Sequence, residues 1–179
     1  MEDLLGHIKF MNDNSKSFMS CWKELRKNLT DDLSDIQHLE LVTQFWSNAP
    51  ISVRTLDWDD PGSWPDPWTF IHNNRFDESA VSVGMFYTLL LSRDSRWLGN
   101  RLQLILVSDQ TRAIQRIILS VDNRWLLNLE YQKVINNQTV AKTYNIQQIY
   151  DYQDNHYFLL KSRRIASVGN IIKNNDTTL

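Results

Sequence analysis

The sequence has few of the residues that cross-link or interrupt small folds. It contains one cysteine, five glycines and four prolines in 179 residues. The single cysteine, Cys21, excludes an internal disulfide and most zinc sites, and it fits a reducing compartment. A chain of this length buries about 70% of its unfolded surface, so its core needs no disulfide or metal for stability.

A strong charge of one sign and long apolar runs are also missing. The formal net charge is −2, so binding to nucleic acid is not expected. We interpret the short basic segment within residues 161–173 as a solvated tail. No run reaches the roughly 18 apolar residues that suggest a membrane span. The first ten residues, MEDLLGHIKF, lack the basic and apolar regions of a signal peptide. We therefore expect synthesis in the cytoplasm and no membrane partner.

No motif in the chain predicts a cofactor or a metal. There is no Gly-rich phosphate loop, and the four histidines are scattered. Asp57, Asp59 and Asp60 form an acidic cluster, with His72 further on. An acidic turn beside Pro-Gly is more often a solvated loop, and the spacing lacks the pattern of a calcium loop. We expect neither a metal site nor a cofactor.

Aromatic residues are abundant instead. The chain has seven tryptophans, and Trp58, Trp64 and Trp68 flank a proline-rich stretch. Rings at this density usually fill a core. The alternative is a surface that anchors a partner protein, with Phe18 and Trp22 as further candidates for that interface.

The period of the apolar residues changes along the chain. A helical period of the apolar residues over 1–48 predicts a helical hairpin, with Thr30 as the N-cap of its second helix. Asp66 is expected to cap a short helix through residue 73. A further helix is expected to begin at Asp77-Glu78-Ser79 and run to Leu91. Beyond residue 100 the period is two and predicts strands over 101–107, 114–121, 125–131, 146–152 and 157–161, with 134–144 ambiguous.

This order predicts an α+β fold, in which an N-terminal helical hairpin is followed by a central helix packed on an antiparallel sheet. The small residues of the central helix, Gly84 among them, are expected to face the sheet. The expected domains are a hairpin over 1–50, an α+β domain over 51–164 and a polar tail over 165–179.

A Trp/Pro segment, an acidic helix start and then strands resemble bacterial transglutaminase-like cysteine peptidases, over about residues 58–160. In that family the helix start carries the cysteine nucleophile, the next strand a histidine and the following strand an aspartate. Laid on this sequence, FDES places Asp77 at the nucleophile. RIILSVD places Arg116 at the histidine, and WLLNLE places Asn128 at the aspartate.

The resemblance therefore implies a degenerate site. Thiolate chemistry needs a cysteine activated by an imidazole, and an arginine stays protonated and cannot act as a base. We expect that the chain is not an enzyme. For Asp77 and Arg116 two readings stay open: they form an ion pair, or, as we favour, Asp77 only caps its helix and Arg116 is an exposed strand residue.

The stretch from Asp60 to Trp68, DPGSWPDPW, resembles the core of uncharacterised small proteins of tailed bacteriophages, notably marine ones. The resemblance implies a structural or adaptor protein of the virion, in the neck or baseplate region. Its partners would be neighbouring subunits in a ring-shaped assembly. Two alternatives stay open: an acyl hydrolase or transferase with a non-standard site, for which Cys21 is a weak candidate, and a phage protein that binds a host target.

Overall fold

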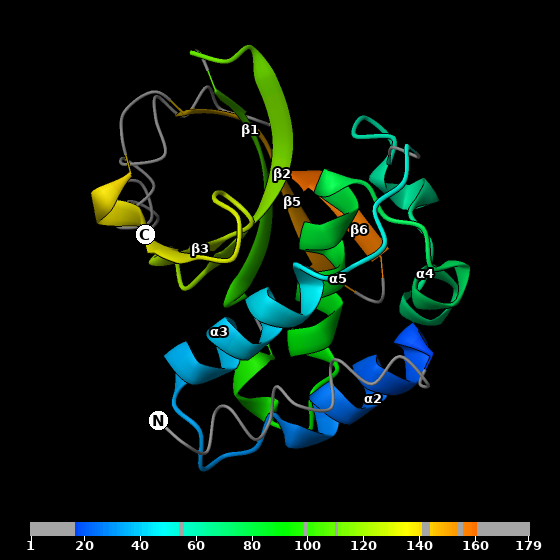
Figure 1. Cartoon of the computed structure of the whole chain (residues 1–179). Coiled ribbons are helices and arrows are strands. Elements are labelled where there is room, and N and C mark those ends of the chain that lie inside the picture. Colours follow the sequence, from blue (N-terminus) through cyan, green and yellow to red (C-terminus); the bar gives the residue numbers. More distant parts are fainter. Residues whose placement is uncertain are drawn as a thin grey trace.

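The fold was obtained as a computed structural model, which describes residues 17–160 except 54–55, 99, 110, 141–143 and 154–155. Its helices, numbered as in Figure 1, are α2 (Phe18–Asn28), α3 (Asp35–Trp46), α4 (Pro67–Asn73) and α5 (Glu78–Leu90). Its strands are β1 (Leu102–Asp109), β2 (Ile114–Val121), β3 (Trp125–Leu127), β4 (Val134–Asn136), β5 (Tyr144–Gln153) and β6 (His156–Leu160). Short 3-10 helices lie at Pro61–Ser63, Ser95–Trp97 and Asn137–Thr139.

The strands form one curved antiparallel sheet in the order β4-β3-β2-β1-β5-β6. Helix α5 lies against one face of this sheet, and α3 crosses in front of α5 (Figure 1). Helices first and a packed antiparallel sheet afterwards confirm the predicted α+β fold with its central helix.

The sheet differs from the prediction at β3. This strand ends at Leu127 rather than near residue 131, because Asn128 has a φ of 63° and so leaves the extended conformation. The ambiguous stretch after it contains the short strand β4.

The second helix of the hairpin begins at Asp35, with Ser34 as its N-cap, and not at Thr30 as predicted. Ser34 and Gln37 form a capping box, since the Ser34 backbone N–H donates to Gln37 Oε1 at 2.8 Å. The Thr30 hydroxyl bonds to Asp32 instead. The capping box satisfies two exposed donors of the first turn, which explains why the helix begins there. The prediction for Asp66 is confirmed, because its side chain accepts from Trp68 N and Thr69 N.

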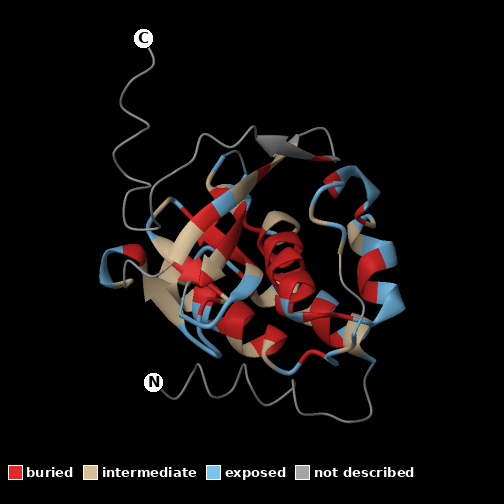
Figure 2. Ribbon diagram, turned by 90° about the horizontal axis from the view of Figure 1, so that it is seen from above, coloured by how far each residue is buried: buried red, intermediate tan, exposed pale blue. Residues whose placement is uncertain are grey.

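Helix α5 is buried on almost every side: eleven of its thirteen residues are buried (Figure 2). The sequence predicted that the small residue Gly84 faces the sheet, and this prediction is wrong. Gly84 faces the indole of Trp46 on α3. The reason is that α5 is sandwiched between the sheet and the hairpin, so both of its sides need close packing.

Apolar residues of α2 and α3 belong to the same buried cluster as α5 and the sheet. The domain boundary expected near residue 50 stays a prediction. The first residues of the expected hairpin and the whole of the expected polar tail lie outside the described residues. In the described part of the chain, no helix has the length and apolar character that a membrane crossing requires.

Candidate functional site: the groove at the start of α5

Asp77 caps helix α5 and is turned inward. Its Oδ1 accepts from the backbone N–H of Ala80 at 2.7 Å, and its side chain is buried. Burial raises the pKa of the Asp77 carboxyl, which the backbone N–H groups of Ala80, Ser79 and Leu56 oppose. The Asp77 carboxylate therefore serves as the N-cap of α5, as the capping alternative predicted.

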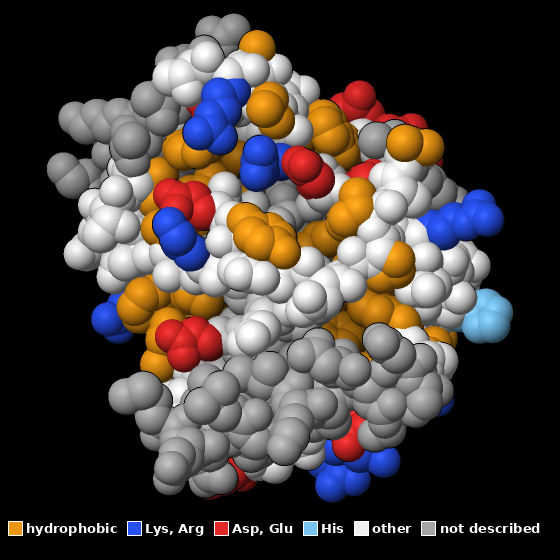
Figure 3. Space-filling view, in the orientation of Figure 1, with side chains coloured by type: hydrophobic (Ala, Val, Ile, Leu, Met, Phe, Trp, Pro, Cys, Tyr) orange, Lys and Arg blue, Asp and Glu red, His pale blue; other side chains and the backbone are white. Residues whose placement is uncertain are grey.

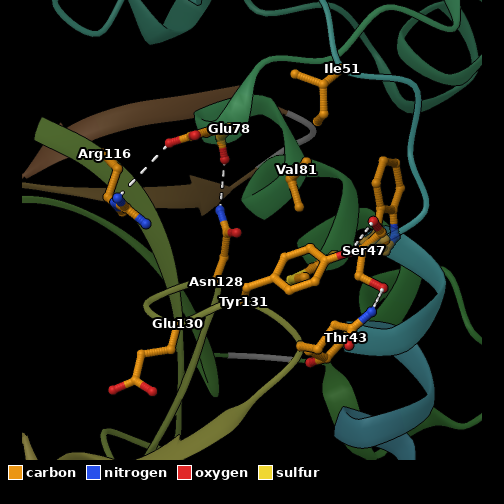
Figure 4. A pocket seen from close by; sticks show the side chains of 12 residues that line it. Thr43, Ser47, Ile51, Glu78, Val81, Arg116, Asn128, Glu130 and Tyr131 are labelled. Carbon is orange, nitrogen blue, oxygen red and sulfur yellow. Dashed lines mark hydrogen bonds and ion pairs between the residues drawn. The ribbon is translucent and has the colours of Figure 1, made fainter.

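Arg116 on β2 pairs with Glu78 and not with Asp77, so the less favoured reading, an ion pair between Asp77 and Arg116, is wrong. Its Nη2 lies 3.9 Å from Oε2 of Glu78, the next residue along (Figure 4). Glu78 is exposed and Arg116 half-buried, and ion pairs of this length near solvent contribute little to stability. The Arg116 guanidinium is thus held near the start of α5 without a strong ionic partner among the described residues.

Asn128 holds the end of β3 to α5. Its Nδ2 donates to the Glu78 carbonyl oxygen at 2.6 Å and to Ser82 Oγ at 2.8 Å. The Ser82 hydroxyl in turn donates to the Ile117 carbonyl oxygen at 2.6 Å. The three positions implied by the resemblance, Asp77, Arg116 and Asn128, therefore lie around the first turn of α5. The structure joins Arg116 and Asn128 through Glu78.

A groove with a cavity volume of about 220 Å³ opens beside this turn. We call it the α5 groove. Its apolar lining consists of Trp46, Ile51, Val81, Met85 and Tyr131. Tyr131 is 71% exposed, and its ring crosses the groove toward Ser47 (Figure 4), whose carbonyl oxygen accepts from the Tyr131 hydroxyl at 3.3 Å.

The polar lining of the groove carries charges of both signs and amides. It includes Glu78, Glu130, Arg116, Asn128 and Gln132. On this face of the molecule, Figure 3 shows a hollow bordered by hydrophobic side chains and by adjacent basic and acidic side chains. Apolar surface beside a few convergent polar groups is the usual composition of a binding site.

Sequence reasoning missed Glu78, Glu130 and Tyr131 as groove residues. The only signal for Glu78 was its place beside Asp77 at the helix start. Tyr131 was expected inside a strand, where its neighbours could not be foreseen.

The aromatic candidates for an interface divide into two groups. Trp22 and Trp64 are buried, and Phe18 packs on Phe45 and Phe76. These rings are used in the core and are not open to a partner: Phe18 and Trp22 belong to the hairpin that folds onto α5, and Trp64 packs on Tyr150 and Tyr157 of the sheet. Among the remaining two, Trp58 is half-buried, whereas Trp68 is 49% exposed.

Other reactive groups are placed away from the groove. The Cys21 thiol is buried and free. Among the described residues, no group of three or more His, Cys, Asp or Glu side chains could hold a metal ion. In the acidic loop, Asp57 Oδ1 accepts from Asp59 N at 3.0 Å and Asp59 Oδ1 accepts from Gln148 Nε2 at 3.0 Å.

The comparisons with known proteins give structural matches alone. No family model matches the chain, and no curated protein matches its sequence. Solved structures of LapG from Legionella pneumophila share its fold, with a TM-score of 0.61, 16% identity and coverage of 89% of each chain. Calcium-bound LapG has a TM-score of 0.61 at 16% identity, covering 92% of this chain and 91% of LapG. EGTA-treated LapG has a TM-score of 0.60 at 17% identity, and the match covers 90% of this chain and 88% of LapG.

LapG is a transglutaminase-like cysteine protease, so the chain has a transglutaminase-like fold, as the resemblance implied. The prediction that the chain is not an enzyme is contradicted by this comparison. That prediction extended the loss of one nucleophile to a loss of all activity. The side chains at Asp77, Arg116 and Asn128 argue only against thiolate chemistry at these positions.

The phage resemblance finds no support in these comparisons. Virion location, partner subunits and a ring-shaped assembly stay predictions.

Proposed function

We propose that the protein binds a polypeptide segment of a partner in the α5 groove. The observation that carries the proposal is the exposed Tyr131 ring, which lies across an apolar concavity at the start of the buried central helix. Exposed aromatic residues beside an apolar pocket are typical anchors in protein recognition.

The size of the groove favours a side chain over a whole small ligand. Pockets for drug-sized molecules measure about 300–1,000 Å³, and this cavity has about 220 Å³. One large apolar side chain of a polypeptide fits between Val81, Met85 and the Tyr131 ring. The rest of that polypeptide would lie along the polar rim.

The rim has the groups that an extended backbone requires. Asn128 and Gln132 supply amides, and Arg116 and Glu78 supply one charge of each sign. Exposed Ile51 adjoins them on an extended segment that pairs with Phe76, where Ser52 N donates to the Phe76 carbonyl oxygen at 2.6 Å. The fold adds support, because LapG, as a cysteine protease, must itself hold a polypeptide.

The test begins with selection of binders from a random peptide library, followed by calorimetric titration of the selected peptides. Tyr131→Ala should weaken binding about tenfold or more, which corresponds to about 1.4 kcal/mol. The matched control is Ile114→Ala, which removes an exposed apolar side chain outside the groove and should leave affinity unchanged. Binders that lose no affinity with Tyr131→Ala would refute the proposal.

Mass spectrometry of the bound peptides separates two uses of the groove. Peptides recovered intact identify an adaptor that holds its partner, and peptides cut at one position identify a peptide-bond hydrolase. The adaptor role within a tailed-phage particle is a further prediction, checked by peptide mass spectrometry of purified particles with copy number.

A further inference from the structure

A second concave site lies at the other end of α5. It has a cavity volume of about 210 Å³ and is formed by α2, α4 and the residues that follow α5. We call it the basic pocket, and its lining residues are Lys23, Arg26, Lys27, Trp68, Leu91 and Arg93.

The charge of the basic pocket is of one sign. Four of its six lining residues are cationic and none is acidic, although the chain as a whole has a net charge of −2. The ion pairs between described residues use Arg96, Arg101, Arg112, Arg116 and Lys133. None of these pairs involves a lining residue of the basic pocket, and like charges gathered in a concavity raise the local concentration of anions.

Arg26 is fixed in the pocket wall by the fold. Its Nε donates to the Leu91 carbonyl oxygen at 2.8 Å, and its Cζ lies 4.3 Å from the Trp22 ring centroid and 5.2 Å from that of Trp68. Burial lowers the pKa of Arg26, which means that its charge is held at a cost. A bound anion would offset that cost, and the fixed guanidinium loses little side-chain entropy on binding.

Trp68 gives the pocket an apolar side. Its ring is 49% exposed, and Lys23 Nζ lies 5.9 Å from its centroid. An exposed ring beside several cations can contact the organic part of a ligand while the cations hold its charged group.

We propose that the basic pocket binds the phosphate group of a small phosphate ester, with the organic part of the ester against Trp68. A phosphate carries up to two negative charges and several acceptor oxygens, so it matches four surrounding cations better than a single carboxylate does. A concave pocket of this size admits one such group. It does not present the flat surface that a bilayer needs or the extended stripe of cations that follows a nucleic acid strand.

The proposal is tested by calorimetric titration of the full chain with ATP, AMP and inorganic phosphate at low and high salt. Lys27→Gln combined with Arg93→Gln removes two exposed charges and should weaken nucleotide binding about tenfold to a hundredfold, since each tenfold step is about 1.4 kcal/mol. Arg112→Gln, which removes an exposed cation at the β1–β2 turn outside the pocket, is the control and should have no effect.

Trp68→Ala separates the sources of the phosphate. If the ligand is an ester, this change weakens AMP binding but not phosphate binding; equal effects on both identify free phosphate. The proposal fails if none of the three probes binds, if Arg112→Gln weakens binding as much as the double variant, or if a hexaglutamate peptide binds more tightly than ATP.

Discussion

The indole ring of Trp46 packs directly on Gly84. A Cβ atom at Gly84 would lie 2.1 Å from Trp46 Cη2 and 2.3 Å from Cζ2, so only glycine permits α3 and α5 to approach this closely. The same indole is one of the residues that line the α5 groove, so the close contact between α3 and α5 adjoins the proposed binding site.

Gly84→Ala should therefore lower the free energy of unfolding by about 1–3 kcal/mol, because overpacking a rigid core forces its neighbours apart. In an unhindered helix the same change is stabilising by about 0.5–1 kcal/mol. Gly62→Ala is the control, since its nearest atom is Asp60 Oδ1 at 3.5 Å. Equal stability of Gly84→Ala and the wild type in denaturant titrations would contradict the close packing.

The Thr88 hydroxyl joins three helices. It accepts from Trp22 Nε1 at 2.9 Å and Trp46 Nε1 at 2.8 Å, and donates to the Gly84 carbonyl oxygen at 2.7 Å. Thr88→Val keeps the shape but leaves two buried donors without an acceptor, which should cost about 2–5 kcal/mol. Thr88→Ser retains the hydroxyl and should cost much less. Similar denaturation midpoints for the two variants would count against this role.

The buried carboxyl of Asp77 makes a pH-dependent contribution to stability. Because its pKa is raised in the folded state, its contribution is greatest below the unfolded pKa of about 3.9 and is lost as pH rises through the folded pKa. Asp77→Asn keeps the cap without the charge, so its stability relative to wild type should increase from pH 4 to pH 7.

Asp77→Ala removes the cap itself and should cost about 0.5–2 kcal/mol at both pH values. A constant difference between Asp77→Asn and wild type across this range would show that the charge is not disfavoured by burial.

His38 gives the opposite pH dependence. Its Nε2 lies 3.0 Å from the Thr30 carbonyl oxygen, and Trp97 Nε1 donates to its Nδ1 at 3.1 Å. The ring is therefore neutral, and its pKa is lowered by burial and by Arg96, against the raising effects of the Thr30 carbonyl, Asp94 and Asp35. Its stabilising contribution is complete above the unfolded pKa of about 6.5 and is lost as pH falls through the folded pKa.

Thermal unfolding between pH 5 and pH 8 measures this effect. His38→Gln should flatten the loss of stability at low pH, whereas His72→Gln, at an exposed position on α4, should leave it in place. If both variants keep the wild-type slope, another group is responsible.

The elements of the fold follow from local patterns. The apolar periods of α3 and α5, the alternation in β1 and β2 and the capping side chains of Asp66 and Asp77 are all short-range signals, and the elements they predict are present. The two misplaced element ends have local causes too. Helix α3 begins after Ser34 rather than Thr30 because Ser34 forms the capping box, and β3 ends early because Asn128 is in the left-handed conformation.

The two candidate sites were not accessible to the same reasoning. The sequence correctly predicted that Arg116 and Asp77 lie at the same end of α5. The Asp77 side chain turns inward, however, so Glu78 supplies the carboxylate that pairs with Arg116. The basic pocket gathers cations from residues 23–27 and Arg93 around Trp68, and no window of the sequence contains them all. Secondary structure depends on neighbours a few residues apart, so it can be read along the chain. Pairing and pocket charge depend on distances between remote segments, which exist only once α2, α4, α5 and the sheet have packed.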